Sequence, residues 1–146
     1  MLRLVQHTGQ AVFLAVEKLF NRAFGEASNP FYYLGAISYY LLWIVVFSGL
    51  YLYAFFSTGV SEAHQSVEAI THHQRWAGGI LRSLHRYASD GMILTMLLHV
   101  VRHFVFDHYR AFRWFSWVTG VALLWLVYMS GVNGYMLPWD RLAQFV

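Results

Sequence analysis

The sequence predicts an all-α membrane protein with three transmembrane helices and one N-terminal amphipathic helix that lies in the membrane interface. Of its 146 residues, 58% are hydrophobic and only 12% are charged, about half of the roughly 25% typical of a soluble globular domain. The stretches 27–61 and 114–139 contain no Asp, Glu, Lys or Arg. Each is longer than the roughly 20 apolar residues that cross a bilayer, so two spans are predicted at residues 32–56 and 114–137.

A third span is predicted at residues 80–105, although this segment carries Arg, Asp and His side chains. Its central run 91–101 (GMILTMLLHVV) is apolar on nearly every face, which suits a buried or spanning helix better than a soluble amphipathic helix. Ionisable groups at depth cost about 2.5–3.5 kcal/mol each on insertion scales and generally face a bundle interior or a functional path. We therefore expect the ionisable residues of this span to face other helices.

The N-terminal segment is predicted to form an interfacial helix at about residues 10–25. Apolar residues such as Phe13 and Phe20 follow helical spacing, and Glu17 belongs to the polar residues expected on the opposite face. The segment has neither an uninterrupted apolar core nor a small-residue cleavage site, so we do not expect a signal peptide.

The chain is expected to divide into an N-terminal interfacial segment, residues 1–29, and a three-span domain, residues 30–146, with a polar connection at 57–79. Cytoplasmic ends of spans carry the excess of Lys and Arg, which places the N-terminus in the cytoplasm and the C-terminus outside a prokaryotic cytoplasmic membrane. The residues counted are Arg3, Lys18, Arg22, Arg102, Arg110 and Arg113 on the inner side, and Arg75, Arg82, Arg86 and Arg141 on the outer side.

The third predicted span contains a symmetric pattern, Arg82-x-x-His85 followed by His99-x-x-Arg102. On a helix the fourteen positions between the histidines correspond to about 1400° of rotation and about 21 Å of rise. Both imidazoles therefore point the same way at two membrane depths. This arrangement predicts two stacked cofactors held by one helix.

Two glycine pairs repeat the histidine spacing: Gly35 and Gly49 in the first uncharged run, and Gly120 and Gly134 in the second. Glycine has no Cβ and permits close approach of other groups to the backbone, so two rows of glycine could make room for two flat macrocycles. The alternative is ordinary small-residue packing between membrane helices.

Haem suits this pattern because imidazole is a strong axial ligand of haem iron. Arg82 and Arg102 each lie one turn from a histidine, and Arg can hold a propionate bidentately. Taken alone, these arginines would be interface anchors whose charged ends reach the membrane surface.

The run GGILRSLHRYASDGMILTMLLHVVRH resembles the second transmembrane helix of the cytochrome b family, and SGVNGYMLPWD resembles the end of its third. The resemblance covers about residues 30–141. It implies that His85 ligates an outer, lower-potential haem b and His99 an inner, higher-potential one. It also implies that the two arginines lie near propionates, that the four glycines face the haems, and that a quinol-oxidation region includes Tyr135, Pro138 and Trp139.

The family's fourth helix supplies the other two axial histidines, and the sequence reaches Val146 before any such helix. The resemblance therefore implies a split form, in which a second membrane subunit completes a four-helix bundle and shares two haems b with this chain. The chain has no cysteine, which excludes disulfides, iron–sulfur ligation and thioether-linked haem on these residues.

The expected function is transmembrane electron transfer through two haems b, coupled to quinol oxidation or quinone reduction. The chain would be an electron-transfer subunit of a respiratory or photosynthetic cytochrome bc-like complex, with a Rieske-type protein, a cytochrome c or a peripheral oxidoreductase as redox partner. Quinone and membrane lipids are expected ligands, and nucleic acid is not. One alternative is a dihaem anchor that passes electrons between quinone and a peripheral oxidoreductase; a second is a non-redox transporter or assembly subunit.

Two further polar pairs occur at helical spacing in the third predicted span. Asp90 follows Arg86 by four positions, which predicts an intrahelical ion pair, with a proton-conducting or partner-contact role as the alternative. His103 follows His99 by four positions; this spacing occurs in zinc sites, but without an acidic partner in the motif we favour an interfacial histidine.

Overall fold

The computed structural model describes residues 1–140, 143 and 145; Arg141, which enters the charge count above, lies outside the described residues. Over this part the chain is helical and contains no strand, which confirms the predicted all-α class. The helices are α1 (Leu2–Phe24), α2 (Leu34–Phe55), α3 (Val60–His72), α4 (Ile80–Val105) and α5 (Trp114–Met136), with short helical turns at Glu26–Ser28, Pro30–Tyr32, Arg75–Gly79 and Ala111–Arg113.

Two segments are long and apolar enough to cross a membrane, namely α2 and Ala111–Met136, which contains α5. With 22 residues, α2 is about 33 Å long, which matches the roughly 30 Å hydrocarbon core of a bilayer. The bounds of α4 coincide with those of the predicted third span. Its charged residues distinguish it from the other two, and its crossing of the membrane stays a prediction.

The N-terminal helix and the predicted polar connection differ from expectation. Helix α1 begins at Leu2 rather than near residue 10, and the connection contains the helix α3. Within α3, Ala63, Val67 and Ile70 are buried, and their spacing of four and three positions forms a narrow apolar stripe. The high polar content around this stripe concealed the helix in the sequence.

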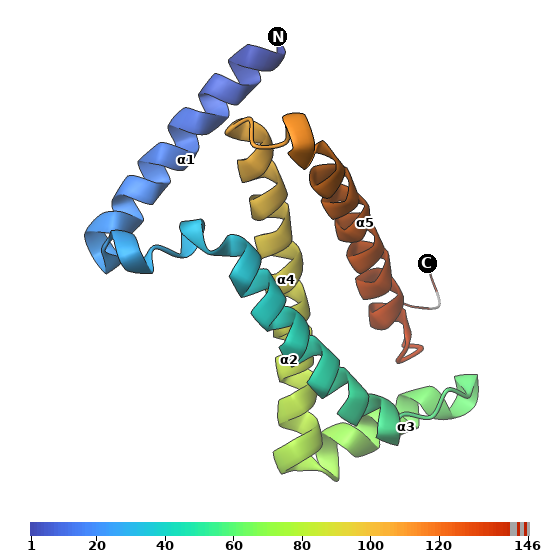
Figure 1. The fold of residues 1–146 in the computed structure, drawn as a ribbon. Coiled ribbons are helices and arrows are strands. Elements are labelled where there is room, and N and C mark those ends of the chain that lie inside the picture. Colours follow the sequence, from blue (N-terminus) through green and yellow to red (C-terminus); the bar gives the residue numbers. More distant parts are fainter. Residues whose placement is uncertain (141–142, 144, 146) are drawn as a thin grey trace.

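Helix α4 lies at the centre of the molecule, with α2 crossing it on one side and α5 running beside it on the other (Figure 1). The most extensive packing is between α2 and α4. Ser38 Oγ of α2 donates a hydrogen bond to Thr95 Oγ1 of α4 at 2.9 Å, a polar link of the kind that joins helices in membranes.

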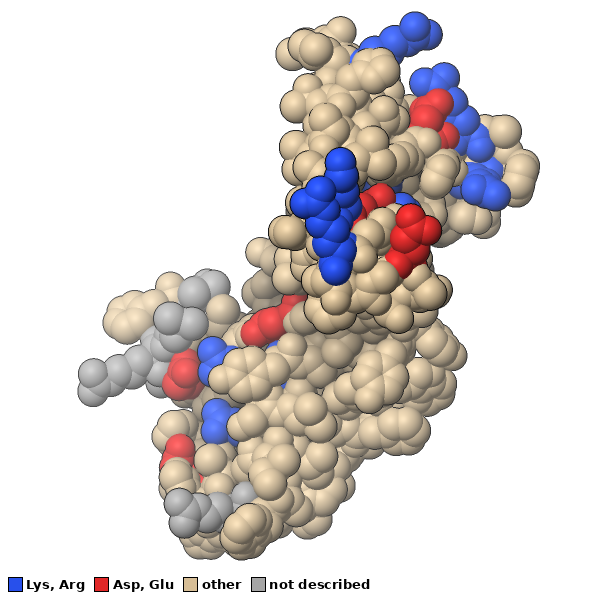
Figure 2. Space-filling view, turned by 90° about the vertical axis from the view of Figure 1, so that its left-hand side faces the viewer, with Lys and Arg blue, Asp and Glu red and all other residues tan. Residues whose placement is uncertain are grey.

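Helix α5 has no buried residue, and large apolar side chains such as Trp125 and Leu126 are exposed along it. Figure 2 shows a broad uncharged area at the lower right, while charged side chains gather at the upper end and along the left edge. Large exposed apolar areas mark contact with lipid or other proteins. This distribution fits a helix bundle that is covered by membrane and neighbouring helices.

Helix α1 packs across the C-terminal end of α4 (Figure 1). The side-chain amides of Gln6 and Gln10 donate to the carbonyls of Phe104 and Val105 at 3.1 and 2.9 Å, which belong to the last turn of α4 and lack partners within that helix. Glu17 is only 4% exposed, so its predicted place on a solvated polar face is wrong. The face of α1 toward α4 is polar as well as apolar, because it binds a helix end.

Candidate cofactor site

The two histidines of α4 lie against the two glycines of α2. A Cβ atom placed on Gly35 would lie 3.0 Å from Cε1 of His99, and one placed on Gly49 would lie 3.0 Å from Cε1 of His85. Carbon atoms in ordinary contact are about 3.5–4.0 Å apart, so only glycine leaves room for each ring. The antiparallel packing of α2 and α4 therefore brings these four predicted site residues together as two matched pairs.

The ring of His85 is held by α2. Its Nδ1 atom lies 3.0 Å from Ser48 Oγ and 3.1 Å from the carbonyl oxygen of Val45. Because a carbonyl only accepts hydrogen bonds, this geometry assigns the ring hydrogen to Nδ1 and the lone pair to Nε2. A histidine that ligates a metal through one nitrogen almost always donates the other N–H in this way, so this tautomer of His85 is compatible with ligation through Nε2.

A cleft of about 370 Å³ lies beside His99, between α4 and α5. Its lining includes His103, Arg113, Trp117 and Gly120, and the ring centroids of His99 and His103 are 4.3 Å apart. The cleft thus combines an aromatic wall with cationic and titratable groups. Within the described part of the chain, no three His, Cys, Asp or Glu residues are placed to hold a metal ion, so the zinc interpretation of His99 and His103 gains no third ligand.

The glycines of α5 differ from those of α2. Apart from the local backbone of α5 and the adjoining residues, no atom of the described chain lies within 4 Å of a Cβ placed on Gly120 or Gly134. Gly120 nevertheless lines the cleft beside His99, where its bare backbone offers a flat wall. An imidazole therefore lies on the α4 side of the cleft and glycine on the α5 side, and Arg113 supplies a positive charge that can hold an acidic group.

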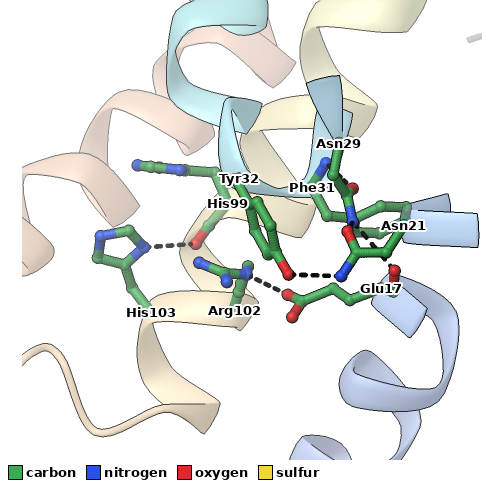
Figure 3. Close-up of polar contacts among 8 residues, drawn as sticks. All are labelled: Glu17, Asn21, Asn29, Phe31, Tyr32, His99, Arg102 and His103. Carbon is green, nitrogen blue, oxygen red and sulfur yellow. Dashed lines mark hydrogen bonds and ion pairs between the residues drawn. The ribbon is translucent and has the colours of Figure 1, made fainter. Parts of the chain in front are cut away.

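The two arginines of the symmetric motif have different partners. Arg102 Nε bonds Glu17 Oε1 of α1 at 2.7 Å, with the side chains 18% and 5% exposed. Figure 3 shows Glu17 reaching Arg102 from α1, while the rings of His99 and His103 lie on the other side of α4. Arg82 instead donates from Nη1 to Thr71 Oγ1 of α3 at 2.8 Å and is exposed. The predicted propionate contacts of both arginines stay predictions.

Asp90 is joined to α5 rather than to its own helix. Tyr135 Oη donates to Asp90 Oδ1 at 2.8 Å, and the Arg86 guanidinium lies 5.8 Å from the centroid of the Tyr135 ring. No Arg86–Asp90 ion pair occurs in the described part of the chain, so the predicted intrahelical pair is wrong. Instead, the carboxylate of Asp90 accepts a hydrogen bond from the phenol of Tyr135 on the neighbouring helix, and the guanidinium of Arg86 lies over the ring of that tyrosine.

The predicted quinone region lies at the C-terminal end of α5. Tyr135 belongs to the last turn of that helix, and Pro138 and Trp139 follow it. Tyr135 and Trp139 are both exposed, and Trp139 has a φ of 50°. The structure brings Tyr135 to Asp90, and the role of this region stays a prediction.

Three residues with direct contacts to the site were not identified from the sequence. Ser48 contacts His85, Glu17 contacts Arg102, and Arg113 lines the cleft beside His99. Ser48 and Glu17 lie 37 and 85 positions from their partners. A polar residue on the apolar side of a helix was the available signal for both, but it does not identify the partner.

The sequence is similar to known proteins over most of its length. The family described as Cytochrome b/b6/petB matches residues 20–145. The chain is similar to cytochrome b6 of Porphyra purpurea, with 39% identity, and to cytochrome b6 of Euglena gracilis, with 37% identity. Both alignments cover 117 residues, which are 80% of this chain and 54% of the relative. The chain therefore spans about half the length of these curated relatives.

Proposed function

This chain belongs to the cytochrome b/b6 family, and on that premise we propose that it carries electrons across a membrane through two b-type haems in a bc- or b6f-type complex. The observation that carries the proposal is the pair of His–Gly contacts between α4 and α2. They repeat after fourteen positions on both helices, which corresponds to two centres about 21 Å apart along the helix.

His85 and His99 would each supply one axial nitrogen to a haem iron. For His85, the bonds of Nδ1 to Val45 and Ser48 support ligation through Nε2. The second axial ligand of each haem would come from outside residues 1–146. A further helix of the complex that completes a four-helix bundle would supply it.

The inner haem would occupy the cleft between His99 and Gly120. Arg113 and His103 in its lining would face the acidic edge of the macrocycle, and Trp117 would cover its apolar part. When bound, haem supplies one-electron exchange at iron. Residues of the chain hold it, exclude water and set the local charge.

In this proposal α4 crosses the membrane together with α2 and α5, and the N-terminus lies on the cytoplasmic side. Electron transfer between the two depths then moves charge across the membrane, which corresponds to about 2.3 kcal/mol per charge at 100 mV. Quinol would react near Tyr135 and Trp139 at the outer end of α5, with a Rieske-type protein or a cytochrome c as partner. The cytochrome b6 relatives support this function over a dihaem anchor for a peripheral oxidoreductase.

The test replaces each histidine in the intact complex and counts haem. His85→Ala and His99→Ala should each remove a different haem, because a methyl group cannot ligate iron. His72→Ala is the matched control, since that side chain is 69% exposed on α3. Haem per complex and the number of redox transitions are measured; two unchanged haem b signals in both variants would refute the ligand assignment.

A further inference from the structure

A buried ion pair joins the end of α4 that carries His99 to the N-terminal helix. Arg102 Nε and Glu17 Oε1 are 2.7 Å apart, and the two side chains are 18% and 5% exposed. Charges removed from water need a partner of opposite sign. Glu17 therefore balances the charge of Arg102, which lies three positions, almost one helical turn, from His99.

A closed set of polar contacts fixes Glu17 in this position. Asn29 is fully buried, and its Nδ2 donates to the backbone oxygen of Glu17 at 3.0 Å and to Asn21 Oδ1 at 2.6 Å. Asn21 Nδ2 donates in turn to Tyr32 Oη at 3.1 Å. The ring of Tyr32 lies 5.6 Å from the guanidinium carbon of Arg102, so the chain of contacts that begins at Glu17 returns to the partner of Glu17 (Figure 3).

Among the described residues, no carboxylate forms an ion pair with the corresponding residue at the other end of α4. Arg82 is exposed, and its hydrogen-bond partner is the neutral hydroxyl of Thr71. The sequence motif is therefore symmetric about the centre of α4, whereas the charges around its two ends are not. Any effect of a balancing carboxylate should reach the centre at His99 and leave the one at His85 unchanged.

We propose that Glu17 is a positioning residue for the inner redox centre: it holds Arg102 and offsets its charge, and so lowers the midpoint potential of the haem ligated by His99. The inference rests on the proposed function. A positive charge near the iron favours the reduced, less positive state, and a carboxylate paired with that charge weakens the effect. The guanidinium has donors besides Nε, so Arg102 can bind Glu17 and an acidic group of the cofactor together.

The test is a charge cycle in the intact complex, with the midpoint potentials of both haems as the measurement. Glu17→Gln should raise the potential of the His99 haem, and Arg102→Gln should lower it. The double variant should lie between them, with less than half of the larger single shift. Neither change should move the His85 haem, and Glu26→Gln, which removes an exposed carboxylate from the same N-terminal region, should move neither.

Shifts of the same sign in both single variants, or equal shifts at both haems, would overturn the proposal and indicate general loosening of α1. If Glu17→Gln alone does not assemble, Arg102→Gln is compared with the double variant, since the two differ only at Glu17. The double variant should then have the higher potential, and equal potentials overturn the inference. Failure of the proposed function is separate, because His99→Ala would then leave both haem signals unchanged.

Discussion

A methyl group added at Gly120 tests whether a cofactor packs against α5. Apart from the local backbone of α5 and the adjoining residues, no atom of the described chain lies within 4 Å of a Cβ at this position, whereas a Cβ at Gly35 would lie 3.0 Å from Cε1 of His99. Gly120→Ala should therefore leave the polypeptide undisturbed when haem is absent. Gly35→Ala should displace the imidazole by about 0.5 Å, the difference from ordinary contact, whether or not haem is present.

The magnitudes follow from these distances. Alanine is more favourable than glycine inside a helix by about 1 kcal/mol, so the apoprotein carrying Gly120→Ala should be as stable as the parent or slightly more stable. A haem in contact with the glycine backbone would meet the new methyl group, and overpacking costs about 1–3 kcal/mol. That energy corresponds to haem affinity lowered about 5- to 150-fold.

The assay combines haem content per complex with thermal unfolding of the haem-free chain in detergent. Gly131→Ala on the same helix is the control, because a Cβ there would lie 3.5 Å from Ile93 Cδ1, an ordinary contact. Gly120→Ala should lose haem while Gly131→Ala retains it. Full haem content and an unchanged spectrum in Gly120→Ala would show that α5 does not face a cofactor at this position.

Three further experiments test the surrounding contacts. Ser48→Ala removes one of the two hydrogen-bond partners of His85 Nδ1, a contact worth about 0.5–1.5 kcal/mol. Haem at His85 should then dissociate up to about tenfold faster, measured by transfer to apomyoglobin. Complete loss of this haem would contradict the expectation that the carbonyl of Val45 still holds the ring. Asn29→Ala removes three hydrogen bonds of a buried side chain, at a cost of about 1–3 kcal/mol, and should increase protease cleavage after α1 in membranes. Unchanged cleavage would mean that this network does not hold α1. Asp90→Ala combined with Tyr135→Phe should destabilise the chain no more than the larger single change in thermal unfolding, because each change removes the same hydrogen bond. Additive losses would show that the two residues contribute independently.

The sequence by itself determined the features that depend on neighbours along the chain. The bounds of α4 and the ends of α2 and α5 follow from runs of apolar residues and from the positions of charges, because helix formation and membrane burial are read over windows of about 20 residues. The spacing of His85 and His99 places them on one face for the same reason. The match of residues 20–145 to the cytochrome b family confirms the resemblance carried by these motifs.

Only the tertiary structure decided which side chains meet. The register of α2 against α4 selects Ser48 and Gly49 as the neighbours of His85, and the docking of α1 buries Glu17 against Arg102. Its charge suggested a polar face for Glu17, although it lies four positions after Phe13 and three before Phe20, on their side of the helix. The pattern along α1 contains no information about its partner Arg102, 85 positions away. The two ends of the near-symmetric motif of α4 therefore have unequal surroundings: Arg102 faces the carboxylate of Glu17, and Arg82 faces the hydroxyl of Thr71. Long-range packing decides this difference, because a buried charge is stabilised by the opposite charge that the fold places beside it.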